Sequence, residues 1–141
     1  MRVSSRTDYG VRALYDLALH YGQGTIQSRE IAARQKMPEA YLHQVLSALN
    51  RGGLVRSVRG PSGGHELTRD PSEITLYDAF EILDGGEINK NHPHHTPMGM
   101  DPVHQIWHEL NDLSVQFLRA ITFQDLVDRT AQRATVPNYS I

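Results

Sequence analysis

The feature that most limits what this chain can fold into is a glycine-rich turn between two short runs of strand-forming residues. The runs are residues 54–58 and 65–67. The turn between them contains Gly60, Pro61, Ser62, Gly63 and Gly64. Two such runs joined by a short glycine-containing turn are typical of a β-hairpin. Arg56 and Arg59 lie just before the turn, so we expect the hairpin to carry two cations near its tip.

Three helical patterns precede the hairpin. Residues 8–21 repeat apolar side chains at helical spacing and are followed by glycines that end the pattern. Ser28 is expected to cap a second helix, and Pro38 opens a third over residues 39–50. Two helices, a short turn and a hairpin indicate a winged helix-turn-helix, whose second helix enters the major groove while a wing arginine reaches the minor groove. The expected fold is mainly α with a small β-hairpin wing.

The distribution of charge agrees with DNA binding at one end of the molecule. Residues 1–70 carry ten lysines and arginines against six acids, a net charge of +4. Residues 71–141 carry four against ten, a net charge of −6. A basic half beside an acidic half indicates that phosphate contacts belong to the N-terminal half.

Composition excludes several classes of protein. The chain has no cysteine, so disulfides, thiolate metal sites and cysteine nucleophiles are absent. It shows no signal-peptide pattern and no apolar stretch of membrane-spanning length, so we expect a cytoplasmic protein without a membrane partner. It also has no H-E-x-x-H, phosphate-binding loop or nucleophile elbow, and we expect it not to be an enzyme.

The C-terminal part reads as a helical region outside the winged domain. Thr75 and Asp78 have the spacing of a capping box for a helix over 76–83. Residues 85–100 lack periodicity, and Asp101 and Pro102 then open a long helix. Eight apolar residues form a stripe that we expect to dimerise: Val103, Ile106, Trp107, Leu110, Leu113, Phe117, Leu118 and Ile121.

These patterns divide the chain into a winged DNA-binding domain (1–84), a histidine-rich loop (85–100) and a dimerisation region (101–141). In the last region, Thr122 and Asp125 are expected to cap a final short helix.

The chain resembles the Rrf2 family of bacterial transcription regulators along almost its whole length. The matching segments are 12–18 (RALYDLA), 30–32 (EIA), 41–46 (YLHQVL) and 53–64 (GLVRSVRGPSGG), with Trp107 and the pair Ile121-Thr122. The resemblance implies a homodimer whose long C-terminal helices cross. It also implies that each subunit places one winged domain on a palindromic duplex DNA site.

The resemblance also implies a set of DNA contacts. Arg59 matches the wing arginine that relatives place in the minor groove, while Ser57 and the backbone of residues 60–64 would lie against phosphate. Gln44 has the amide geometry to bond adenine. The full expected set is Tyr41, His43, Gln44, Arg56, Ser57, Arg59, Gly60, Pro61, Ser62, Gly63 and Gly64. Because His43 stands where some relatives carry glutamate, their base preference does not transfer.

The sensor region departs from the family pattern. Many Rrf2 proteins hold a 2Fe–2S or related cluster through three cysteines, often with a histidine, in the loop before the long helix. This chain has none of those cysteines, and thiolates normally hold such a cluster. We therefore expect no cofactor and no conventional iron–sulfur cluster.

Three interpretations of the loop remain open. In the first, the loop belongs to a regulator that has lost its cluster and responds to a small molecule, to a partner protein or to no signal. In the second, it is a pH-responsive loop with clustered imidazoles. In the third, it is a divalent-metal site, with nitrogen and oxygen ligands from His92, His94, His95, Asp101 and His104. Asp8 would join that set by analogy with a family variant, although that variant has a histidine where this chain has Arg12.

An adaptor that uses its winged domain only to bind proteins is the alternative to a DNA-binding regulator. Such a module needs neither the paired arginines beside the glycine turn nor a basic N-terminal half.

Overall fold

A computed structural model describes residues 3–86 and 101–135 of the chain. The described part is mainly helical with one two-stranded antiparallel sheet, which confirms the predicted fold class. The elements are α1 (Ser5–Leu19), α2 (Ser28–Gln35), α3 (Glu39–Arg51), β1 (Val55–Val58), β2 (Gly64–Leu67), the 3-10 turn η1 (Pro71–Glu73), α4 (Leu76–Leu83), α5 (Pro102–Arg119) and α6 (Phe123–Thr135).

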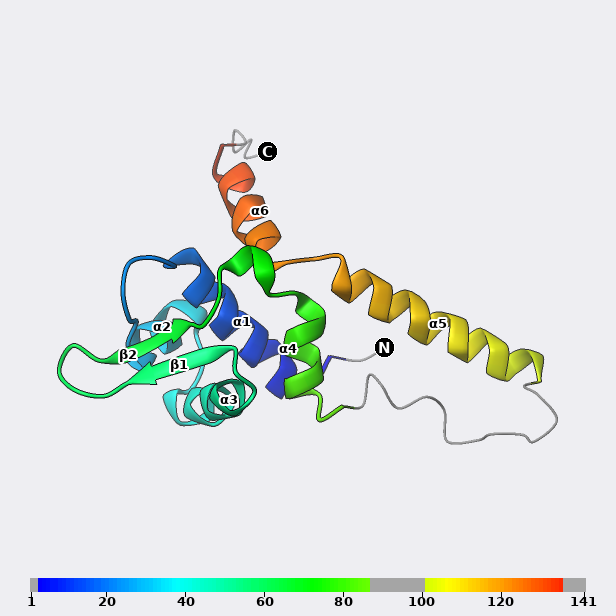
Figure 1. Cartoon of the computed structure of the whole chain (residues 1–141), viewed down its shortest axis with the longest axis horizontal. Coiled ribbons are helices and arrows are strands. Elements are labelled where there is room, and N and C mark those ends of the chain that lie inside the picture. Colours follow the sequence, from blue (N-terminus) through cyan, green and yellow to red (C-terminus); the bar gives the residue numbers. More distant parts are fainter. Residues whose placement is uncertain (1–2, 87–100, 136–141) are drawn as a thin grey trace.

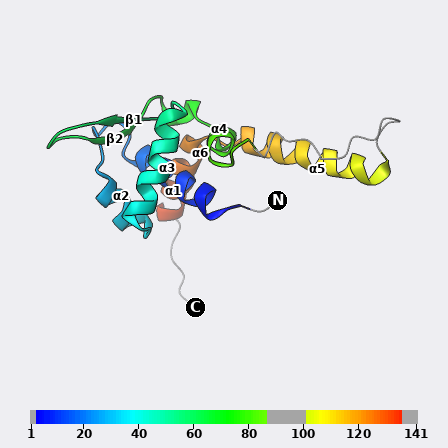
Figure 2. The same cartoon turned by 90° about the horizontal axis from the view of Figure 1, so that it is seen from below.

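α1 lies at the centre of the body, where it packs against α2, α3, α4 and α6. The hairpin of β1 and β2, called the wing below, extends from one end of the body, and α5 extends from the other (Figures 1 and 2). Both views show the far end of α5 standing away from the other described elements. Within residues 3–86 and 101–135, no helix combines the length and apolar character needed to span a bilayer.

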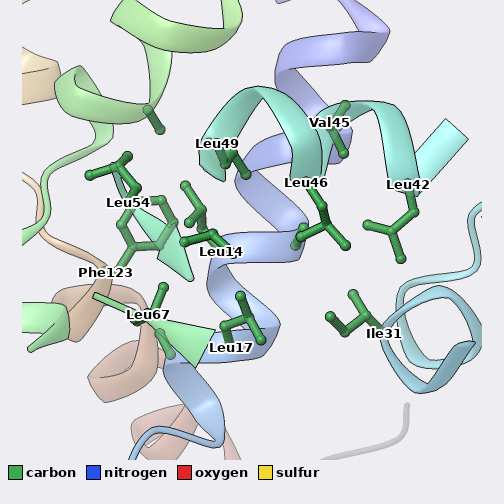
Figure 3. Close-up of a cluster of buried hydrophobic side chains, with 14 of the residues drawn as sticks. Leu14, Leu17, Ile31, Leu42, Val45, Leu46, Leu49, Leu54, Leu67 and Phe123 are labelled. Atoms are coloured by element: carbon green, nitrogen blue, oxygen red, sulfur yellow. The ribbon is translucent and has the colours of Figure 1, made fainter. Parts of the chain in front are cut away.

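Side chains from α1, α2, α3, the wing and α6 meet in one hydrophobic core (Figure 3). In α3, four apolar residues at helical spacing are all buried: Leu42, Val45, Leu46 and Leu49. Phe123, at the start of α6, is buried in the same core, and its N–H donates to the Ile74 carbonyl at 2.9 Å. The core therefore ties the C-terminal helix to the winged unit.

A buried ion pair fixes α2 against α1. The Asp16 carboxylate is fully buried and accepts hydrogen bonds from Arg34 Nε at 2.9 Å, Arg34 Nη2 at 2.8 Å and Gln35 Nε2 at 3.2 Å. The hydrogen bond to Asp16 raises the pKa of Arg34 above its ordinary value. Because an unpaired buried carboxylate is costly, this contact favours one placement of α2.

Three predicted helix starts are confirmed. Thr75 and Asp78 exchange hydrogen bonds at the start of α4, and Thr122 and Asp125 do so at the start of α6. Asp101 Oδ1 accepts from the first N–H groups of α5 at 2.9 and 3.0 Å. Each side chain satisfies backbone donors that lack a partner within the helix.

Two helix starts differ from the prediction. α1 begins at Ser5, three residues earlier than expected, because the Ser4 side chain accepts a hydrogen bond within the first turn. Ser28 is the first residue of α2 and not its cap, which is Gln27. The Gln27 N–H donates to Glu30 Oε2 at 3.3 Å, so a side chain inside the helix bonds the cap.

The wing is held by a third segment that the sequence pattern did not indicate. β1 and β2 pair in the register Val55↔Leu67, Arg56↔Glu66, Ser57↔His65 and Val58↔Gly64. On the other side of β2, Ile26 and His65 exchange backbone hydrogen bonds at 2.9 and 2.8 Å. The segment between α1 and α2 therefore fixes the wing to the helical body.

Candidate nucleic-acid interface

The exposed side of α3 carries the residues that we predicted to face DNA. His43 and Gln44 are exposed, and His43 Nε2 lies 3.6 Å from Glu39 Oε1. Tyr41 is half-buried, and its ring stands edge-on to that of Tyr9 with centroids 5.1 Å apart. His43 and Gln44 are thus open to a ligand, whereas Tyr41 also supports the packing of α3 on α1.

The two wing arginines have different surroundings. Arg56 pairs across the hairpin with Glu66, its Nη2 lying 2.7 Å from Glu66 Oε1. Arg59 is exposed and makes no hydrogen bond or ion pair to any residue that the structure describes. The Arg56 charge is partly neutralised by Glu66, while the Arg59 charge at the tip remains available to an anion.

Glycine is required where the wing tip meets the body. The Thr25 hydroxyl donates to the Ser62 carbonyl at 2.9 Å, and the Gly63 N–H donates to the Gly60 carbonyl at 2.9 Å. A Cβ at Gly64, whose φ is +154°, would lie 2.6 Å from the Ile26 carbonyl oxygen. These contacts leave Pro61, Ser62 and Arg59 exposed at the tip.

A small pocket lies between α3 and the wing, and we call it the junction pocket. Its volume is about 250 Å³. It is lined by His43, Leu46, Ser47, Asn50, Arg51, Ser57 and His65. Asn50 Nδ2 donates to Ser57 Oγ at 3.1 Å, and Ser57 Oγ is also hydrogen bonded to His65 Nδ1 at 2.8 Å. A chain of polar groups therefore joins the recognition helix to both wing strands.

Sequence reasoning missed Asn50 and His65 as members of this site. In the sequence, His65 stands out only as part of the strand-forming run 65–67. In fact burial lowers its pKa, and the nearby His43 lowers it further. Because side chains alternate between the two faces of a strand, the sequence is consistent with Ser57 and His65 on the same face of the hairpin. Only the pairing register of β1 and β2 shows that these two residues are directly opposite each other.

One side of α5 presents an apolar surface, called the α5 stripe below. Its exposed residues are Val103, Ile106, Trp107, Leu110, Leu113 and Phe117. Leu113 and Phe117 are 62% and 64% exposed. The other two of the eight residues expected at the dimer interface, Leu118 and Ile121, are buried by their own chain, Leu118 against Tyr77 and Phe80.

The residues considered for a metal are not brought together in the described part of the chain. His92, His94 and His95 lie outside the described residues. Asp8 Oδ1 accepts a hydrogen bond from Arg12 Nε at 3.0 Å. Asp101 caps α5, and its Oδ2 lies 3.3 Å from His104 Nδ1. Within 3–86 and 101–135, no three histidine, aspartate or glutamate side chains form a group able to hold an ion.

Hydrogen bonds account for the ionisation of Asp101. Hydrogen bonds from the backbone and side chain of His104, and then from the Val103 N–H, lower the pKa of the Asp101 carboxyl. The carboxylate therefore acts as a helix cap in the folded chain.

Comparisons with known proteins agree on one group of relatives. A family model described as Rrf2, iron-dependent transcriptional regulator, matches residues 3–129. The HTH-type transcriptional regulator IscR of Photorhabdus laumondii is 35% identical over 131 residues, which cover 91% of this chain and 80% of that protein. The IscR of Escherichia coli O1:K1 / APEC is 34% identical and covers 91% and 81% respectively.

Solved structures agree with the sequence comparisons. The structure of CymR, the global cysteine regulator of B. subtilis, superposes with a TM-score of 0.82 at 29% identity, covering 92% of this chain and 98% of that one. The T. potens IscR structure superposes with a TM-score of 0.80 at 31% identity, covering 99% and 94%.

Proposed function

The chain belongs to the Rrf2 family of transcriptional regulators, and from this premise we propose that it binds a palindromic duplex DNA site as a homodimer. In this proposal α3 enters the major groove and the wing tip reaches the adjacent minor groove. The observation that carries it is Arg59, which is exposed at the wing tip and unpaired among the described residues. A narrow minor groove concentrates negative potential and attracts such an arginine.

The exposed side of α3 supports the major-groove part of the proposal. Gln44 is exposed, and its amide carries the donor and acceptor that bind an adenine edge bidentately. His43 presents an imidazole beside it. Ser57 and the backbone at the wing tip position the domain by contacting phosphates, and Arg56 supports the hairpin through Glu66.

The α5 stripe supports the homodimer. Six large apolar side chains along one helix are roughly half exposed or more, and soluble monomers rarely expose so large a contiguous apolar surface. A second copy of the chain is the occupant that we propose. In a two-fold symmetric dimer, the same surface of both copies forms the interface, and the α5 stripe can serve as that surface. Aromatic residues such as Trp107 and Phe117 are typical of interface centres.

The proposed function does not include an iron–sulfur cluster bound by cysteine thiolates. The family model is described as iron-dependent, but the chain contains no cysteine. The residues present therefore do not fit a conventional iron–sulfur cluster.

Salt-dependent DNA binding tests the proposal. Duplexes are first selected from a random pool by the protein, and affinity is then measured by gel shift as salt increases. If a dimer contacts six or more phosphates, we expect affinity to fall by roughly a thousandfold or more between about 50 and about 200 mM salt. A scrambled duplex of equal length is the control and should bind much more weakly.

A protein-interaction adaptor would give a different result. It would select no sequence from the pool, and its affinity for the selected and scrambled duplexes would be equal. That outcome would reject a sequence-specific regulator.

A further inference from the structure

The junction pocket contains more polar chemistry than the proposed DNA contacts use. It lies where α3 meets the wing, beside the exposed His43. Two imidazoles, two hydroxyls, an amide and a guanidinium line it, and none of its lining residues is an acid. A pocket with these groups next to a DNA-binding surface is suited to an anion.

Hydrogen bonding at Ser57 depends on where the protons of His65 lie. A serine hydroxyl has one hydrogen to donate and two lone pairs that accept. The Asn50 amide occupies one lone pair. When His65 Nδ1 carries a hydrogen, it donates to the second lone pair, and the Ser57 hydroxyl must donate elsewhere. When Nδ1 carries none, the hydroxyl donates to His65, and Ser57 has no hydrogen left for a ligand.

The charged groups around the pocket are few. From α3, the pocket receives His43 and Arg51, and Glu39 lies 3.6 Å from His43. Arg51 Nη1 donates to Ser47 Oγ at 2.9 Å. The ion pair of Arg56 and Glu66 occupies the next register position, whose side chains project from the opposite face of the hairpin.

The segment that pairs with the other edge of β2 adds no charge, because residues 25–28 are all uncharged. His65 is therefore influenced mainly by its own burial and by His43, and both favour its neutral form in the free protein.

We propose that the junction pocket binds one phosphate of the DNA backbone, and binds it more tightly when His65 is protonated. This inference rests on the proposed function. The charge of a phosphate favours the imidazolium form of a histidine beside it. Protonated His65 donates from Nδ1 to Ser57, and the Ser57 hydroxyl turns to donate to a phosphate oxygen. Binding thus takes up protons, so affinity rises as pH falls.

Affinity measured against pH tests the inference. Fluorescence anisotropy with the selected duplex is recorded between about pH 8 and about pH 6, at constant ionic strength. We expect the wild-type affinity to increase as pH falls, by at most about tenfold per pH unit for each proton taken up. His65→Gln should give a weaker dependence on pH.

Two further variants separate the mechanism from general effects. Ser57→Ala should lose more affinity near pH 6 than near pH 8, because protonated His65 always carries a hydrogen on Nδ1, whereas the neutral ring does so in only one of its two tautomers. His108→Gln, on α5 outside the pocket, is the matched control and should keep the wild-type pH dependence. Circular dichroism at each pH checks that the variants are folded.

The outcomes are distinguishable. Affinity independent of pH, or an unchanged pH dependence in His65→Gln, overturns this inference and leaves the proposed function intact. No DNA binding at any pH overturns the proposed function itself. Inorganic phosphate is a second probe. If phosphate alone changes the NMR signals of the His65 ring as much as the selected duplex does, the pocket binds free phosphate. That result would overturn the proposal that it binds a phosphate of the DNA backbone.

Discussion

Arg56 and Arg59 are only three positions apart, yet their side chains have different surroundings in this chain. The register of the hairpin places Arg56 directly opposite Glu66, so its guanidinium is engaged on the wing surface. Arg59 lies beyond the last paired residue of β1, where no described acid binds it. The difference arises from position in the hairpin, because both residues have the same chemistry.

Replacing Arg59 tests this difference. We expect Arg59→Ala to weaken specific DNA binding by about 1–3 kcal/mol, since a minor-groove arginine contributes about that much. Arg129→Ala, which removes an exposed arginine from α6, is the matched control and should leave affinity unchanged. Isothermal titration with the selected duplex measures both. Equal affinities for Arg59→Ala and the parent protein would remove Arg59 from the mechanism.

At the residue scale, the sequence predicted the kinds of side chain at the site better than their partners. The glycine turn and its arginines were evident from composition and spacing. The contact of His65 with Ser57 and Asn50 was not, because it depends on strand register and on how α3 meets the wing. Tyr41 likewise contacts Tyr9, which lies far from it in the sequence.

Among the elements that the structure describes, α5 exposes a row of large apolar side chains. The α5 stripe runs along the helix from Val103 to Phe117, whereas Leu118 in the last turn packs on α4 of the same chain. The helix is thus anchored at its C-terminal end and exposed along the rest of its length. This arrangement presents the stripe to a second copy at a distance from the wing (Figure 1).

Charges placed in the α5 stripe should prevent dimerisation. In Leu110→Glu/Phe117→Glu, two carboxylates would have to be buried without partners at the proposed interface, which is strongly unfavourable. We expect monomers in sedimentation experiments, while helix content stays unchanged because both side chains are exposed in the single chain.

Gln116→Glu is the control, since it adds a carboxylate at an exposed position of α5 outside the stripe. It should sediment like the parent protein. A double variant that still sediments as a dimer would place the dimer interface on another surface.

On the scale of the whole molecule, charge is divided unevenly between the two halves of the chain. The N-terminal half, which contains the wing and α3, carries a net +4, and the C-terminal half carries a net −6. The wing and the far end of α5 lie at opposite ends of the molecule (Figure 1). A dimer joined through α5 would therefore leave both wings free to contact DNA.

The absence of cysteine leads to a prediction for the whole protein. Purified without oxygen, it should show no absorbance from an iron–sulfur cluster, because it has no thiolate to hold one. DNA affinity measured before and after treatment with a chelator should be unchanged. Affinity that is lost on chelation and restored by one divalent metal would contradict this expectation. It would support the histidine and carboxylate site considered from the sequence.

The sequence by itself determined the local structure of this protein. Hydrophobic periodicity identified α3 and its buried residues, and the spacing of Thr75 with Asp78 and of Thr122 with Asp125 identified two helix starts. The turn between β1 and β2 was evident because only glycine tolerates such backbone conformations and close approaches. All of these features depend on residues close together in the chain.

Only the tertiary structure decided which distant residues meet. It paired Ile26 with β2, buried Asp16 under Arg34, and opposed Ser57 to His65. It also divided the eight apolar residues predicted to form one stripe into six that are exposed and two that are buried by their own chain. Hydrophobic periodicity cannot distinguish these two groups, because it predicts all eight residues on one helix face. These contacts depend on how helices and strands pack against one another, and that packing is set by all the side chains of the core together.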